Sequence, residues 1–132
     1  MKNLIYVFAF VALLICQSCN NKNEAQKNFD SIETVKETLK GEPSYLSADG
    51  KCLVFFLDAE TAEVDVINSN GELDELFKSD VIITTDSNGK VVLKFGDRAE
   101  FTPEKLTIYG GSTYTNFNQY TPQQLMEKGI NL

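Results

Sequence analysis

The sequence predicts a mainly β domain, either a small antiparallel meander or a partly closed barrel, with one helix before it and a short helix after it. Three pairs, Asp49-Gly50, Asn70-Gly71 and Asn88-Gly89, are each followed by Lys or Glu and then by apolar residues. Such Asx-Gly pairs are strong signals for tight β-hairpins. Helical patterns are confined to the two ends of residues 30–132, so the strands between them should form the body of a single domain.

The first helix is predicted at residues 31–40, where it would cover one side or end of the core. Asp30 and Glu33 have the spacing of a capping box, with Asp in place of the usual Ser or Thr. Gly41, followed by Pro43, is a natural end for the helix. A narrow apolar stripe faces the core and consists of Ile32, Val35 and Leu39.

Seven or eight short strands are expected from residue 45 onward. Residues 52–57 (CLVFFL) are apolar without alternation, which is typical of a central strand covered on both faces. Residues 62–68 alternate, which would place Glu63 and Asp65 together on a solvated face. Residues 72–77 (ELDELF) fit either a strand or one helical turn. Further strands are predicted at residues 81–85, 90–95, 99–101, 105–109 and 112–120.

A short C-terminal helix is predicted at residues 122–128. Thr121 and Gln124 have capping-box spacing, and Pro122 occupies the first helical position, where proline is favoured. Gly129 should end the helix.

The N-terminus has the pattern of a secretory signal. One lysine, Lys2, precedes the apolar residues 4–15, and a basic start followed by a short apolar segment is typical of such signals. About 20 apolar residues are needed to cross a bilayer, so this segment is too short for a comfortable span.

The border that follows, Cys16-Gln17-Ser18-Cys19, resembles the lipobox of bacterial lipoproteins, in the loose form common in Bacteroidetes. Cys19 fits the lipidated position because Ser18 before it is small, whereas Cys16 follows bulky Ile15 and stands where the class usually has Leu. The resemblance implies a signal peptide at residues 1–18, a lipid on Cys19, a flexible tether at residues 19–29, and attachment to a membrane of the cell envelope. It does not indicate which membrane holds the lipid or on which side of that membrane the domain lies. A cleaved soluble protein and an uncleaved anchor are the alternatives.

The net charge and the residue types present limit the partners and the reactions that can be expected of this protein. Removing residues 1–18 takes the formal net charge from −7 to −8, and a chain this acidic should repel nucleic acid. The sequence contains no histidine, which removes the usual general base, the Ser-His and Cys-His nucleophiles and the commonest zinc ligand. We therefore expect a protein that is not an enzyme and has no metal or cofactor. Cys52, the one cysteine left after Cys19 is lipidated, should be a buried thiol.

The uncharged residues 110–121 (GGSTYTNFNQYT) are the predicted binding segment. In a continuous strand, four alternating side chains would share one face and present aromatic rings beside amides, as a glycan- or peptide-binding surface does. Aromatic and Thr-rich strands are also ordinary β-formers, so a plain surface is the alternative. The candidate ligand-binding residues are Tyr109, Tyr114, Asn116, Asn118 and Tyr120, with Phe117 beside them.

These features lead to two hypotheses, a lipid-anchored envelope module that binds a glycan or a partner protein, and a carrier of a small apolar ligand. At the level of its strand pattern the domain resembles small calycin-like barrel lipoproteins, which implies an interior lined by residues such as Phe55, Phe95 and Phe101. An enclosed cavity would favour the carrier, and a packed interior would favour the surface binder. The sequence leaves the oligomeric state open.

Three weaker patterns indicate further candidate functional sites. Asp30-Ser31-Ile32 resembles the short O-glycosylation sequon of Bacteroidetes, which implies a sugar on Ser31. Glu63 and Asp65 would be about 7 Å apart along a strand, near the separation in inverting glycosidases, but a solvated surface is the expectation. Residues 86–89 (DSNG) look like part of a calcium loop, lack its remaining ligands, and are expected to form a turn.

Overall fold

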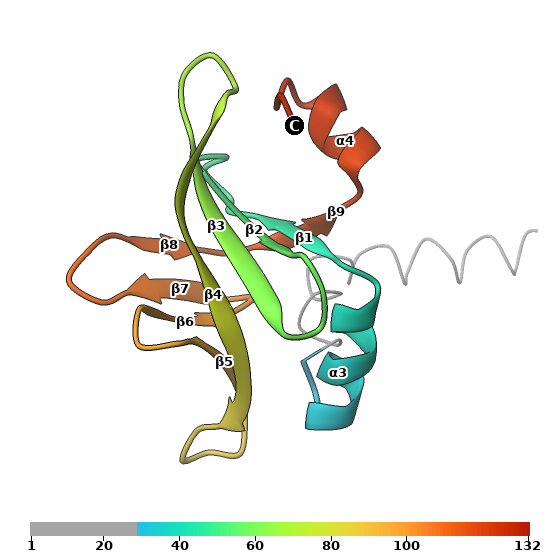
Figure 1. The fold of residues 1–132 in the computed structure, drawn as a ribbon, viewed down its shortest axis with the longest axis vertical. Coiled ribbons are helices and arrows are strands. Elements are labelled where there is room, and N and C mark those ends of the chain that lie inside the picture. The colour runs from blue at the N-terminus through green and yellow to red at the C-terminus, as the bar shows by residue number, and fades with distance from the viewer. Residues whose placement is uncertain (1–28) are drawn as a thin grey trace, which may run out of the picture.

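The structure, a computed structural model, describes residues 29–132. The predicted signal peptide, Cys19 and most of the tether lie outside the described residues. The predicted fold class is confirmed: nine antiparallel strands form one curled, half-barrel sheet with a helix near each end of the molecule (Figure 1). None of the helices within residues 29–132 is both long and apolar enough to span a membrane.

The elements follow one another closely along the chain. In order they are α3 (Ile32–Lys40), β1 (Ser44–Leu46), β2 (Cys52–Phe56), β3 (Thr61–Ile67), β4 (Leu73–Thr85), β5 (Val91–Phe95), β6 (Ala99–Thr102), β7 (Lys105–Ile108), β8 (Thr113–Thr115), β9 (Asn118–Tyr120) and α4 (Pro122–Glu127).

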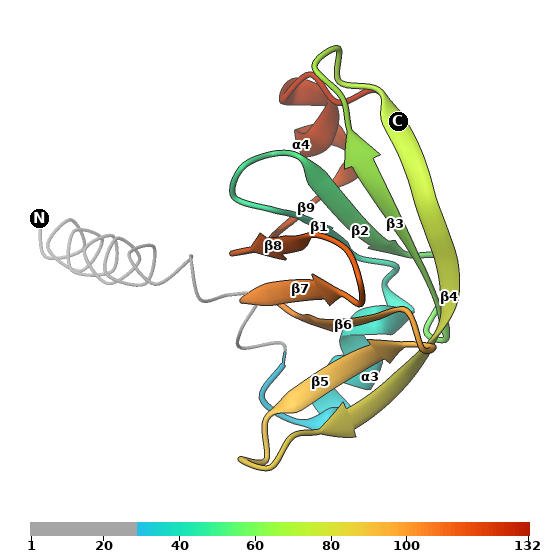
Figure 2. The same cartoon turned by 90° about the vertical axis from the view of Figure 1, so that its left-hand side faces the viewer.

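The sheet is a meander that returns to its own beginning. Each strand from β1 to β7 pairs with the strand that follows it, and β9 pairs with β1. Only Asn116 and Phe117 separate β8 from β9, so a two-residue link joins the two edge strands. The link is held by hydrogen bonds from the Asn116 N–H to the Glu104 carbonyl (2.9 Å) and from the Phe117 N–H to the Pro103 carbonyl (2.7 Å). This connection requires the sheet to curl, as Figure 2 shows.

The long strand β4 joins the two halves of the sheet. Residues 73–80 pair with β3, whereas residues 81–85 pair with β5. Residues 72–77, which also fitted a helical turn, therefore belong to an extended strand from Leu73 onward, because cross-strand pairing with β3 satisfies their backbone. A β-bulge lies opposite Val64 and Asp65 and leaves Leu76 as the extra, exposed residue.

The concave side of the sheet holds a core of aromatic rings. Phe95 and Phe101 stack with centroids 5.9 Å apart, and Phe101 meets Phe117 edge-on at 5.2 Å. Val35 and Leu39 of α3 are fully buried against this core, as predicted. Ile32, the third residue of the predicted apolar stripe, is exposed at the start of the helix. Burial of such rings and aliphatic side chains contributes about 1.5–3 kcal/mol each relative to exposure.

A second, smaller apolar cluster lies on the other side of the sheet. Leu46, Leu53 and Ile67 from β1, β2 and β3 pack there with Leu125 of α4 and with Ile130. Strand β2 thus has both faces covered, as expected, but it lies third from the β9 edge instead of at the centre of the sheet. The sheet has one or two more strands than predicted.

The N-terminal cap of α4 is the one predicted from the sequence, whereas that of α3 is a different residue. Thr121 and Gln124 form the predicted capping box of α4. The cap of α3 is Ser31 instead of Asp30, because the Ser31 hydroxyl accepts the N–H of Thr34 at 3.1 Å. Serine is as good an N-cap as aspartate, so the helix starts one residue later.

Candidate binding groove

The predicted aromatic face is divided between the two sides of the sheet. Asn116 has a φ of 57°, which interrupts the strand after three residues and breaks the period-2 alternation. Tyr114 therefore packs against the aromatic core, whereas Tyr120 packs against the cluster under α4. The expectation that four side chains from Tyr114 to Tyr120 share one face is wrong.

The other two aromatic candidates also lie apart from Tyr120. Phe117 is 2% exposed and belongs to the core. Tyr109, just after β7, is nearly half exposed. Partial desolvation, followed by the hydrogen bond and negative charge of Glu100, raises the pKa of its hydroxyl.

Asn118 and Tyr120 nevertheless line an open groove of about 770 Å³ at one end of the molecule. Its walls are the β1–β2 turn, the β3–β4 turn and the segment that follows α4. We call it the amide groove. Its polar lining consists of Ser47, Asp49, Asn68, Ser69, Asn70, Asn118 and Lys128, with the ring of Tyr120. The first two turns were predicted, but their meeting with residues 118–130 depends on the tertiary fold.

Side-chain hydrogen bonds hold the turns of the amide groove in place. The Asp49 carboxylate accepts the Ser47 hydroxyl at 2.6 Å and the Lys51 N–H at 2.9 Å, and the bond from Ser47 is the main reason that its pKa is lowered. In the β3–β4 turn, the Asn68 amide oxygen accepts the N–H groups of Asn70 and Glu72 at 2.8 and 3.0 Å. These bonds pre-organise the groove, which lowers the entropy cost of binding.

The C-terminal segment is fastened to the β3–β4 turn. The Asn131 N–H donates to the Gly71 carbonyl at 2.8 Å, and its side-chain amide donates to the Asn70 carbonyl at 3.3 Å. Gly71 has a φ of 81°, and a Cβ there would overlap the carbonyl oxygen of Gly129. Two segments far apart in the sequence thus form one wall of the amide groove.

Lys128 is the cation of the amide groove. Its ammonium lies 4.8 Å from the centroid of the Tyr120 ring, and it makes no salt bridge to a carboxylate of residues 29–132. The Tyr120 ring packs against the apolar cluster under α4 and also makes a cation–π contact with Lys128. The ring is therefore not free to stack on a sugar. The groove therefore offers amides, hydroxyls and the positive charge of Lys128, together with the Asp49 carboxylate, which accepts hydrogen bonds from Ser47 and the Lys51 N–H.

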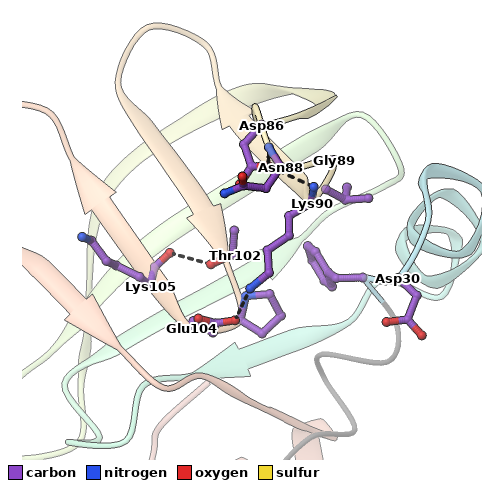
Figure 3. Close-up of a pocket in the computed structure, with 11 residues that line it drawn as sticks. Asp30, Asp86, Asn88, Gly89, Lys90, Thr102, Glu104 and Lys105 are labelled. Atoms are coloured by element: carbon purple, nitrogen blue, oxygen red, sulfur yellow. Dashed lines mark hydrogen bonds and ion pairs between the residues drawn. The ribbon is translucent and has the colours of Figure 1, made fainter.

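A second hollow of about 400 Å³ lies at the other end of the sheet (Figure 3). Phe29 and Asp30, the β4–β5 turn and the β6–β7 turn surround it. Lys90 bridges the two turns through an ion pair with Glu104 at 3.1 Å. The Asp86 carboxylate accepts the N–H groups of Asn88 and Lys90, so residues 86–89 form the expected turn.

The pair of acids on β3 is buried, contrary to the expected solvated face. Glu63 is 9% exposed and Asp65 only 2%, and the Asp65 Oδ1 atom has no hydrogen-bond partner. Burial, followed by hydrogen bonding to Glu63 and its charge, raises the pKa of Asp65 to about 7. Lys78 lies 3.6 Å from the Glu63 carboxylate. The alternation on β3 was correct, but this face is not solvated, because it adjoins the cluster under α4.

The remaining candidates are single residues. Cys52 is buried and free, as predicted, and burial raises the pKa of its thiol to about 12. Ser31 is exposed, and its hydroxyl is engaged in capping α3 and in a 2.8 Å contact with the Thr34 hydroxyl.

Within residues 29–132, no three His, Cys, Asp or Glu side chains are grouped so that they could hold a metal ion. In comparisons with known proteins, the chain matches no family model, no curated protein and no solved structure.

Proposed function

We propose that the protein is a lipid-anchored binding module of the cell envelope and that the amide groove binds a glycan. The observation that supports this most strongly is that Asn68, Asn70, Asn118 and Lys128 all line one pre-organised groove. Amide side chains donate and accept at the same time, which suits sugar hydroxyls. Lys128, which has no carboxylate partner in the described part of the chain, favours a glycan with an anionic substituent such as a sugar carboxylate.

The position of the groove relative to the chain entry supports this proposal. Phe29, the first described residue, is buried among the core rings, 6.2 Å from Tyr45 and 6.0 Å from Phe101. The chain enters beside α3, whereas α4 and the β3–β4 turn lie at the other end of the molecule (Figures 1 and 2). With a lipid on Cys19, nine residues would connect it to Phe29, a span of at most about 36 Å. The amide groove would then face away from the membrane.

The packed interior favours surface binding over the carrier hypothesis. Phe95 and Phe101, proposed to line a ligand cavity, are fully buried and in contact with each other. Phe55, the third proposed lining residue, packs with the cluster on the α4 side of the sheet. The rings thus occupy the space that an apolar ligand would need, and we do not propose a carrier.

The glycan proposal is tested by titrating isotope-labelled full-length protein in detergent micelles with soluble envelope oligosaccharides, neutral and uronic-acid-containing, and following the amide NMR signals. We expect the acidic sugars to shift the signals of residues 68–71 and 118–120. Asn118→Ala and Lys128→Met should each weaken binding at least tenfold, which corresponds to about 1.4 kcal/mol.

Asn88→Ala, in the exposed turn at the other end, is the matched control and should bind like the wild type. If no oligosaccharide shifts the groove signals while an envelope protein does, the ligand is a protein and the glycan proposal is wrong. For the anchor, labelling with radioactive palmitate should disappear in Cys19→Ser, and undiminished label would contradict the assignment of Cys19.

A further inference from the structure

Asp65 is a buried carboxyl group with an unmet hydrogen-bonding requirement. It is 2% exposed, and its Oδ1 atom has no partner in the described structure. An ionised carboxylate in such a place is costly, because water is excluded and one oxygen lacks a donor. A protonated Asp65 carboxyl can instead donate a hydrogen bond to the neighbouring Glu63 side chain, an interaction that raises the pKa of Asp65.

The charges around Asp65 strengthen this preference for the protonated form. Glu63 on the same strand and Glu75 on β4 are both acidic and raise the pKa of Asp65, while Lys78 on β4 opposes them. Lys78 lies 3.6 Å from both the Glu63 and the Glu75 carboxylates, so it is shared between them. From β2 the cross-strand neighbour is apolar Leu53, and the titratable group nearby is the buried Cys52 thiol, whose pKa the charge of Asp65 helps to raise.

This acid pair adjoins the packing of α4. Leu53, which pairs with Asp65, belongs to the same buried cluster as Leu125 of α4 and Ile130. Ile67, two residues beyond Asp65 on the same side of β3, belongs to it too. Ile67 and Ile130 also line the amide groove. A charge formed at Asp65 would therefore appear at the edge of the contact that positions one wall of that groove.

We propose that protonation of Asp65 controls how firmly α4 packs on the sheet and thereby the shape of the amide groove. This regulation rests on the proposed function of the groove. With Asp65 protonated, this residue adds no negative charge to the Glu63 and Glu75 side chains that share Lys78, and α4 stays in place. When Asp65 ionises, like charges at Glu63, Asp65 and Glu75 face one another, and the adjoining cluster must admit water or shift.

The proposal is tested without any ligand, by methyl NMR of full-length protein in detergent micelles labelled at Leu, Ile and the Asp carboxyl carbons, between pH 5 and 9. We expect the Leu125 and Ile130 methyl signals to shift with a midpoint near pH 7, together with the Asp65 carboxyl signal. The methyl signal of exposed Ile82, in the second half of β4, is the internal control and should stay constant.

Asp65→Asn should abolish the methyl titration, whereas Glu75→Gln should keep it and lower its midpoint, because one repelling charge is lost. Constant Leu125 and Ile130 signals in the wild type would overturn the proposal, as would a titration that persists in Asp65→Asn. The wild-type titration decides the matter even if Asp65→Asn fails to fold. Because no glycan is present, this outcome is independent of whether the groove binds one.

Discussion

Gly71 packs directly against the backbone of Gly129, so that a Cβ on Gly71 would overlap the Gly129 carbonyl oxygen. Gly89 provides a matched comparison, because it has the same φ of 81° but nothing within 4 Å of its Cβ position. Substitutions at Gly71 and Gly89 can therefore separate the free-energy cost of backbone strain from the cost of lost packing.

We expect Gly89→Ala to lower the free energy of unfolding by about 1–2 kcal/mol, the cost of a left-handed alanine. Gly71→Ala should cost about 1–3 kcal/mol more, because the turn must move away from the C-terminal segment. Urea denaturation followed by circular dichroism measures both. Equal losses for the two variants would show that the contact with Gly129 contributes nothing.

The stability of the protein should depend more on the Phe101 ring in the aromatic core than on any single aromatic ring at the surface. Phe101 is fully buried and meets the rings of five residues, Phe29, Tyr45, Phe56, Phe95 and Phe117. Phe101→Ala should lower the free energy of unfolding by about 3–5 kcal/mol, as expected for a large cavity. Tyr109→Ala, at a half-exposed ring, should cost less than about 0.5 kcal/mol. Chemical denaturation of the two variants side by side provides the test.

Asp65 should make the protein less stable as the pH rises from about 4 to about 7. The folded state keeps the proton of Asp65 up to a pKa of about 7, whereas the unfolded chain releases it near pH 4. The folded state binds more protons within this window, so the contribution to stability falls with increasing pH and levels off above about 7.

Melting temperatures of wild type and Asp65→Asn, recorded between pH 4 and 8, check this expectation. The difference between the two proteins should change by several degrees in favour of the variant as the pH rises. A pH-independent difference would mean that Asp65 is already ionised in the folded state.

The Cys52 thiol should be inert in the native protein. It is fully buried, and its pKa of about 12 leaves almost no thiolate at pH 8. A thiol-reactive chromogenic disulfide should therefore modify Cys52 at least a hundredfold more slowly in buffer than in denaturant. The difference between wild type and Cys52→Ala isolates this thiol from the cysteines near the N-terminus. Rapid native reaction would show that β2 opens readily.

Local patterns in the sequence were sufficient for much of the fold. The turns at Gly50, Gly71 and Gly89, each with positive φ, and the capping box from Thr121 to Gln124 were predictable because they depend on residues within a few positions of one another. The cover on both faces of β2 could be predicted as well, since an unbroken apolar strand needs it, although β4 and not β2 is the middle strand of the sheet.

The candidate site was only partly predictable. Asn118 and Tyr120 were recognised from their residue types, but the partners that complete the amide groove, Asn68, Asn70 and Lys128, were not. Asn70 lay in a predicted turn, and no pattern indicated that this turn would lie beside the segment after α4.

The sequence by itself determined most of the strands, the three Asx-Gly turns and the cap of the C-terminal helix, because these follow from hydrogen bonds and steric limits between near neighbours. The tertiary structure alone decided which faces are covered. The link at Asn116 sends Tyr114 and Tyr120 to opposite sides of the sheet, and the apolar cluster under α4 adjoins the face of Asp65. Burial depends on elements that are distant in the chain, so neither alternation nor residue type could reveal it.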